Sequence, residues 1–528
     1  MAAVDTNTVW QERVTKKQQE CFQKIQPAWR IPSSFWDSFQ TPLAEHKTDL
    51  VQAQAIRKSG ILSNRELDIT ENYTVSRLLS SLAKGDLTSA EVTLAYCKRA
   101  AVAQQLVNCL TETMFEEAQK RAEYLDNLRS QGQLAGPLHG LPISIKDNFH
   151  YKGTQSIIGM FSFMDEVSSE SSPLVEVLLK LGAVIYVKTN VPQTMMTTDS
   201  HNNVFGRTLN PRNTLLGPGG SSGGEGALIA LRGSPLGVGT DIGGSVRIPA
   251  LCCGTYGFRP SAARVPNGGM RVCTTSGMKF VLSCAGPLSL DLDGIETFFK
   301  TLFDARPALY DSTILDIPWR QVSTKQKLRI GIVPESPNFP LQPPVQRTLA
   351  NAIRILKSQG HHVIPLDSKE CHITEANSVA FGTFALDSAA RNLLESSGDP
   401  PVPALGHLGR QGEKLKKYLA PASDTSKLDR MAPPAQSTAV EHDTFGLPPY
   451  TAFLNALDFP SCILPFGHVN AEDATGKYEL KEHQVGPEYN FDVLNGAPCS
   501  IQLFTLNMRD EECLQMAKQI DQDLKNRA

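Results

Sequence analysis

A glycine-rich segment in the middle of the chain places the strongest constraint on its fold. Residues 217–245 read GPGGSSGGEGALIALRGSPLGVGTDIGGS, and eleven of these 29 positions are glycine. Clustered glycine indicates flexibility, phosphate binding, or a backbone that must pass close to a ligand. A linker would be polar throughout, whereas the run ALIAL at 227–231 is apolar. We therefore expect this segment to enter a packed interior.

Two phosphate-binding motifs fit the segment poorly. A P-loop needs a lysine directly after its last glycine, and no lysine follows any glycine here. The dinucleotide pattern G-x-G-x-x-G begins at Gly237 and Gly239, but Ile242 stands where the third glycine belongs. The remaining interpretation is an enzyme site lined by backbone amides.

The end of the segment predicts a nucleophile beside an oxyanion hole. Gly243 and Gly244 immediately precede Ser245, so the backbone there has little steric restraint. The consecutive N–H groups from Ile242 to Ser245 are expected to converge on one oxygen and stabilise its negative charge. Ser245 would then need a base. No histidine motif is evident, and a distant His/Asp pair stays open.

The overall composition is that of a folded, nearly neutral protein. Of its 528 residues, 41% are hydrophobic and 20% charged, which excludes a disordered chain. The net charge of -3 favours neither nucleic acid nor anionic lipid as a partner. No stretch reaches the roughly 18 consecutive apolar residues of a membrane-spanning helix, and the first residues lack a secretory core. We expect a cytoplasmic protein that binds no nucleic acid.

The eleven cysteines do not form a recognisable framework. None form C-x-x-C, and no Cys/His cluster has zinc-ligand spacing, so no metal is expected. Reduced thiols in a cytosolic protein are the simplest interpretation. Cys252 and Cys253, which follow the nucleophile segment, are expected to be small buried hydrophobic side chains.

Alternating helix and strand signals predict a layered α/β fold. Helix-to-strand steps occur at 173–187 and again at 344–365, as a layered core requires. Ser63 with Glu66 and Thr88 with Glu91 have capping-box spacing. Further helices are predicted at 75–84, 114–128 and 510–525, and strands at 143–145, 183–187, 328–333 and 363–365.

Several long strings resemble the amidase signature family. They are PLHGLPISIKD (137–147), VKTNVPQTMM (187–196), GGSSGGEGA (219–227) and GTDIGGSVRIP (239–249). The chain is most similar to the fungal acetamidase or general amidase branch. This resemblance implies one α/β/α domain over 71–528, with a mixed β-sheet sandwiched between helical layers. Residues 1–70 are expected to form an N-terminal helical extension.

The resemblance also implies a catalytic triad of Lys146, Ser221 and Ser245. In similar enzymes the peptide bond that leads into Ser221 is cis. A lysine at its reference pKa of about 10.4 is a poor base at neutral pH, but burial would lower its affinity for the proton. Ser221 would then relay the proton of Ser245 to Lys146.

Supporting roles are expected for Ser222, Asp241 and Arg247, and a substrate-binding role for Met195. Ser222 either orients Lys146 or stabilises the loop. Asp241 and Arg247 flank the nucleophile and are expected to form a structural ion pair. Met195 borders the substrate pocket in similar enzymes, although a methionine is as often part of a core.

Residues 396–443 depart from the family pattern. They are rich in Pro, Ser, Gly and charge, which predicts a long, partly mobile surface segment. The part from 413 to 443 is shorter than in similar acetamidases, and DRMAPP at 429–434 stands where a more apolar strand is expected. The back of the pocket, and with it substrate choice, is the feature that this departure affects.

The expected reaction is hydrolysis of a carboxylic amide to a carboxylate and ammonia or an amine, through an acyl-enzyme and without a cofactor. The expected partner is a small-molecule amide, and a homodimer is left open. Alternatives are a hydrolase that tailors a larger metabolite, a feebly active or non-catalytic binding protein with this fold, and an amidotransferase subunit.

Overall fold

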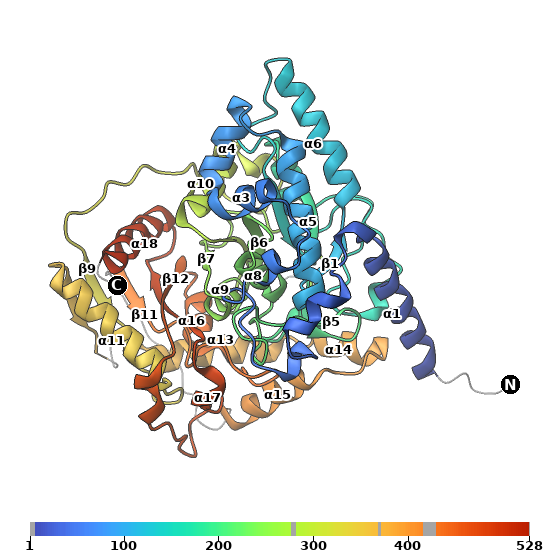
Figure 1. The fold of residues 1–528 in the computed structure, drawn as a ribbon. Helices are drawn as coiled ribbons and strands as arrows, with labels where there is room; N and C mark the ends of the chain where they lie inside the picture. Colours follow the sequence, from blue (N-terminus) through green and yellow to red (C-terminus); the bar gives the residue numbers. More distant parts are fainter. Residues whose placement is uncertain (1–5, 276–280, 368–370, 416–428, 527–528) are drawn as a thin grey trace.

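One large mixed β-sheet runs through the protein (Figure 1). The computed structural model describes residues 6–275, 281–367, 371–415 and 429–526. The sheet has eleven strands in the order β1-β3-β2-β6-β8-β7-β12-β13-β11-β9-β10. Their bounds are β1 (Leu110–Thr113), β2 (Pro142–Lys146), β3 (Val184–Thr189), β6 (Leu236–Asp241), β7 (Tyr256–Arg259), β8 (Cys284–Ser289), β9 (Arg329–Ile332), β10 (His362–Pro365), β11 (Asp429–Ala432), β12 (Ser461–His468) and β13 (Pro498–Phe504).

Helices surround this sheet in layers, as the α/β/α expectation requires. One group, α10, α11 and α18, packs together and against the sheet, and α8 and α9 form another packed pair on it. The helices are α1 (Thr6–Gln23), α2 (Ala55–Lys58), α3 (Asn64–Asn72), α4 (Val75–Lys84), α5 (Ser89–Val107), α6 (Phe115–Ser130), α7 (Pro173–Lys180), α8 (Gly223–Ala230), α9 (Arg247–Cys253), α10 (Leu292–Asp304), α11 (Pro343–Ser358), α13 (Ile373–Leu386), α14 (Ala389–Ser397), α15 (Pro403–Leu415), α16 (Pro449–Ala456), α17 (Phe491–Leu494) and α18 (Asp510–Lys525).

Local signals in the sequence explain several of these boundaries. Ser63 and Glu66 form the predicted capping box at the start of α3. Gly85, with φ of 84°, ends α4 in the left-handed conformation that glycine adopts without strain. The predicted helices at 173–180 and 510–525 agree with α7 and α18.

The parallel pairing of β2 with β6 positions the site. Ser144 lies opposite Gly237 and Ile145 opposite Val238, and β2 also runs parallel to β3. Because parallel neighbours end at the same edge of a sheet, the carboxyl ends of β2 and β6 lie side by side. Lys146 ends β2 and Asp241 ends β6.

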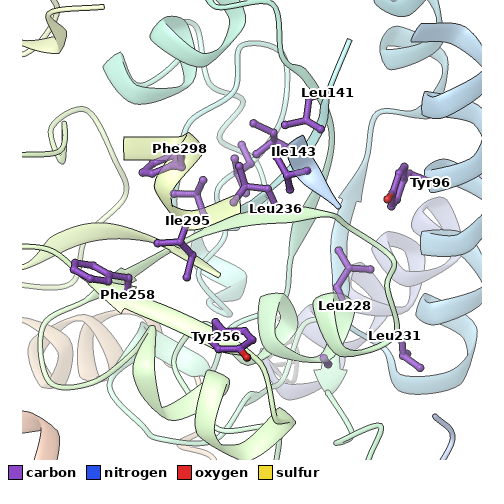
Figure 2. Close-up of a cluster of buried hydrophobic side chains, with 14 of the residues drawn as sticks. Tyr96, Leu141, Ile143, Leu228, Leu231, Leu236, Tyr256, Phe258, Ile295 and Phe298 are labelled. Atoms are coloured by element: carbon purple, nitrogen blue, oxygen red, sulfur yellow. The ribbon is translucent and has the colours of Figure 1, made fainter. Parts of the chain in front are cut away.

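The main hydrophobic core fixes these strands from both sides. Figure 2 shows part of this cluster, including Ile143 of β2, Leu236 of β6, Leu228 of α8 and Ile295 of α10. All of these side chains are almost fully buried. The strand ends and the helix that starts at residue 223 are therefore held rigidly by packing.

The N-terminal extension shares this core. Ile25, Trp29, Phe35 and Leu50 belong to the same cluster as the sheet residues. Trp29 packs edge-on against Phe115 of α6, with ring centroids 5.5 Å apart. Residues 6–70 therefore stabilise the same body as the sheet.

The expectation of a surface segment over 396–443 is wrong for its last third. β11 pairs with both β13 and β9 inside the sheet, and residues 431–440 are all buried. The polar side chains there find partners: Gln436 Nε2, for example, donates to the carbonyl of Val485 at 2.6 Å. Local composition misled the prediction because those partners come from distant parts of the chain. Residues 416–428 lie outside the described part.

Among the described residues, no helix is both long enough and apolar enough to cross a lipid bilayer.

Candidate active site

Lys146 and Ser221 are in direct contact in the interior of the protein. Lys146 Nζ donates hydrogen bonds to Ser221 Oγ at 2.7 Å and to Thr240 Oγ1 at 2.9 Å. The Lys146 side chain is fully buried, and Ser221 is 2% exposed. The Gly220–Ser221 peptide bond is cis, as the family resemblance implied. The structure thus brings together two of the three predicted triad residues.

Burial changes the chemistry of the Lys146 amine. It lowers the pKa of Lys146 from 10.5 to about 7, although the charges of Asp241, Glu225 and Asp147 act in the opposite direction. A lysine with such a pKa is neutral in a large fraction of molecules at physiological pH. Lys146 can therefore accept a proton there.

Close backbone contacts explain why this segment is rich in glycine. A Cβ atom on Gly220 would lie 2.3 Å from the carbonyl oxygen of Asp199. One on Gly224 would lie 2.4 Å from the backbone nitrogen of Asn190. Neither backbone atom can move aside cheaply, so any larger residue would push Ser221 away from Lys146.

Ser245 lies on the loop between β6 and α9, which is hydrogen-bonded to the segment that contains Ser221. The backbone N–H of Ser222 donates to the carbonyl oxygen of Ser245 at 3.1 Å, which joins the two serine-bearing segments. Ser245 is partly exposed, unlike Ser221 and Lys146. Its hydroxyl makes no hydrogen bond within the described part of the chain. Of these three side chains, Ser245 is the one that a substrate can reach most directly.

Asp241 and Arg247 hold the Ser245 loop in shape. Both side chains are fully buried, and Arg247 donates from Nη2 to Asp241 Oδ1 at 3.0 Å and from Nε to Oδ2 at 3.1 Å. Burial alone would raise the pKa of Asp241, but the charge and hydrogen bonds of Arg247 outweigh it and hold this pKa below its usual range. The predicted ion pair is present.

The Asp241 carboxylate accepts a hydrogen bond from one of the four N–H groups that were expected to form the oxyanion hole. The N–H of Gly244 donates to Asp241 Oδ1 at 2.9 Å, and that of Val246 to Oδ2 at 3.1 Å. The amide of Gly244 is therefore already occupied, contrary to the expectation that all four amides face one oxygen. The N–H groups of Ile242, Gly243 and Ser245 have no acceptor among the described residues.

We predict that Asp241→Asn lowers the free energy of unfolding by about 3 kcal/mol, because it leaves the buried Arg247 charge without a counter-ion. Denaturant titration of the purified variant measures this change. Asp316→Asn is the matched control, since Asp316 pairs with Arg306 on the surface, where solvent screens the charges and the pair contributes little to stability. Equal effects of the two substitutions would contradict the buried-pair argument.

Ser222 contacts the backbone of Thr240, and Met195 contacts an apolar cluster. Ser222 Oγ bonds to the backbone carbonyl and N–H of Thr240, each at 3.4 Å, and not to Lys146. Its contact is therefore one that stabilises the loop. Met195 packs at the edge of an apolar cluster that includes Ile158 and Cys273. Nearby, the buried hydroxyl of Thr197 has no hydrogen-bond partner among the described residues.

Sequence reasoning missed two polar residues that touch the Lys146 environment. Thr240 accepts a hydrogen bond from Lys146. Glu225 is fully buried on α8 and accepts from Ser144 Oγ at 2.6 Å and Thr189 Oγ1 at 2.9 Å. Burial raises the pKa of Glu225 to about 8. The available signal was the position of Glu225 within the otherwise uncharged run GGEGALIA (223–230), because a run of this composition is expected to be buried.

Within the described ranges, no three His, Cys, Asp or Glu residues are grouped as a metal site would need. Cys252 and Cys253 are fully buried free thiols, and burial raises the pKa of both. They are inert side chains of α9.

Comparisons with known proteins show the family to which this chain belongs. The family model described as Amidase matches residues 91–430. An amidase of Gibberella moniliformis is 36% identical over 98% of this chain and 99% of its own length. An acetamidase of Emericella nidulans is 34% identical over 98% of both chains. A solved structure of a fatty acid amide hydrolase has a TM-score of 0.84 at 28% identity and covers 99% of this chain and 97% of that one. The chain therefore belongs to the amidase signature family of amide hydrolases.

Proposed function

We propose that the protein hydrolyses a carboxylic amide through an acyl-enzyme on Ser245, with Ser221 as proton relay and Lys146 as base. The observation that carries this proposal is the 2.7 Å hydrogen bond between Lys146 Nζ and Ser221 Oγ in a fully buried setting. Burial supplies a base of pKa about 7. The backbone hydrogen bond from Ser222 to Ser245 supports the proposed connection between the Lys146–Ser221 pair and the nucleophile.

The chemistry runs in two halves. Ser245 Oγ attacks the amide carbonyl carbon, its proton passes to Ser221 Oγ, and the proton of Ser221 passes to Lys146 Nζ. The N–H groups of Ile242 and Gly243 stabilise the charged carbonyl oxygen. The C–N bond then breaks, and the nitrogen leaves with the relayed proton. Water attacks the ester by the same path and releases the carboxylate and Ser245.

We propose a small aliphatic primary amide as the substrate class, which yields ammonia. The name acetamidase of a relative that matches nearly the whole chain supports this choice. The eleven free cysteines support the cytoplasm as the proposed compartment. The homodimer stays a prediction, which light scattering in solution tests.

A hydrolysis screen tests the proposed function. Ammonia release is measured on acetamide, longer aliphatic amides and aryl amides, and intact-mass spectrometry follows adduct formation with a fluorophosphonate probe. We expect turnover of at least one aliphatic amide and a single adduct that maps to Ser245. A folded protein that is never labelled and turns over no amide would be a binding protein, and the proposal would fail.

The pH dependence of kcat/KM gives a separate prediction. Only neutral Lys146 can act as base, and its pKa is about 7. Activity should therefore fall as the pH drops through about 7, by about tenfold per unit below about 6, and level off above about 8. A profile of kcat/KM from pH 5 to 9 measures it. A midpoint near the ordinary lysine value of about 10 would remove Lys146 from the role of base.

A further inference from the structure

The loop formed by residues 242–245, called here the oxyanion loop, has free space beside Gly243 and none beside Gly244. A Cβ atom on Gly244 would lie 2.3 Å from Thr451 Oγ1, so that side is filled. A Cβ atom on Gly243 would meet only two ring carbons of Phe384, each at 3.7 Å, and nothing else within 4 Å. That distance is ordinary van der Waals contact. The gap between Gly243 and the Phe384 ring therefore accommodates about one methyl group.

Phe384 lies on a helix that is anchored at several points. It belongs to the last turn of α13, which packs against α16 (Figure 1). Phe381, one turn earlier, packs against the ring of Phe339 at 6.1 Å between centroids. Just past the helix end, Asp387 accepts hydrogen bonds from the backbone and hydroxyl of Thr275. These contacts therefore hold in place the helix that contains Phe384.

Helix α16 links α13, which contains Phe384, to the oxyanion loop. Thr451 of α16 donates from Oγ1 to the carbonyl oxygen of Gly243 at 2.7 Å. Arg247 in turn donates from Nη2 to the carbonyl of Thr451 at 3.2 Å. The position of Phe384 relative to Gly243 is therefore set by the Thr451–Gly243 hydrogen bond and by the packing of α13 against α16.

We infer that Phe384 limits the length of the acyl group that the enzyme accepts. This inference rests on the proposed function, in which the carbonyl oxygen of the substrate binds at the amides of Ile242 and Gly243. In a primary amide the acyl chain is the one carbon substituent of that carbonyl, so an apolar wall beside these amides contacts the acyl chain. The substrate class is then short-chain aliphatic amides of about two to three carbons.

The test compares acyl-chain selectivity in wild-type protein and Phe384→Ala. In the wild type, kcat/KM should be higher for acetamide and propionamide than for hexanamide. Phe384→Ala should raise the hexanamide-to-acetamide ratio of kcat/KM at least about tenfold, because even one methylene contributes about that much discrimination in an apolar pocket. Phe384→Trp should shift the ratio the other way. A ratio that stays within twofold in both variants would overturn the inference.

Two controls keep the result interpretable. Leu386→Ala alters a 71% exposed side chain of the same helix and should leave the ratio unchanged. Labelling rates with ethyl and octyl fluorophosphonates give the same comparison without an amide, and Phe384→Leu replaces Phe384→Ala if thermal melting shows that the latter is unfolded. If Ser245 is labelled but the chain-length selectivity of the variants is unaltered, the role of Phe384 is refuted and the proposed function is not. Absence of labelling in folded wild-type protein refutes the proposed function.

Discussion

Ser245→Ala should reduce amide turnover by about 10⁴-fold or more and abolish formation of the acyl-enzyme. Without the hydroxyl no covalent intermediate forms, and losses of this size follow removal of the nucleophile in other serine hydrolases. The Lys146–Ser221 hydrogen bond and the amides of Ile242 and Gly243 stay in place. Substrate should therefore still bind. Steady-state kinetics and intact-mass spectrometry after fluorophosphonate treatment measure the effect.

The control for this variant is Ser130→Ala, which removes an exposed hydroxyl at the end of α6. It should be labelled at the wild-type rate. Continued labelling of Ser245→Ala at another serine, together with retained turnover, would move the nucleophile elsewhere in the chain. Ser221 would be the first candidate, because it already contacts the buried amine.

Lys146→Met should depress kcat by about 10³-fold while the protein stays folded. Methionine has nearly the length of lysine, so it fills the same space, but it accepts no proton from Ser221 and the relay has no end point. The free energy of unfolding should change little or rise, since the amine is fully buried and pays a desolvation cost. Kinetics and thermal melting test the two halves of this prediction.

The chain offers a matched control in Lys188→Met. Lys188 on β3 is also fully buried, and burial lowers its pKa to about 8. Its Nζ, however, donates to Ser156 Oγ at 2.8 Å and lies 4.0 Å from Asp147. This variant should keep turnover within about tenfold of wild type. If both variants lost activity equally, the loss at Lys146 would reflect general damage to the interior.

The predictions that held were those that rest on local pattern. The apolar run before Lys146 indicated a buried strand that ends there, and β2 ends at Lys146. Capping spacing placed the start of α3, and the family strings implied a cis peptide bond before Ser221 that the structure contains. These features depend on neighbours within a few residues or on long motif strings, so the sequence carries them directly.

The predictions that failed depend on partners far away along the chain. Residues 431–440 read as surface because they are polar, yet they are buried against residues from β9, β13 and the segment near Val485. The amide of Gly244 donates to Asp241 rather than to a common oxygen, and the Asp241 carboxylate is itself held by Asn455, 214 residues away along the chain. Phe384 and Thr451 lie beside Gly243 although more than 130 residues separate them from it along the chain, and no local sequence pattern indicates this proximity.

By itself the sequence indicated the residues of the candidate site: a lysine at the end of an apolar strand, two serines among glycines that permit close backbone contact, and an acid and an arginine around the second serine. The tertiary structure decided which amides stay open, how deeply the amine is buried and how much room remains beside the carbonyl. The physical reason is that these three quantities arise from packing between distant segments. Residue type and short-range spacing specify conformation, whereas solvent exclusion and free space are properties of the assembled interior.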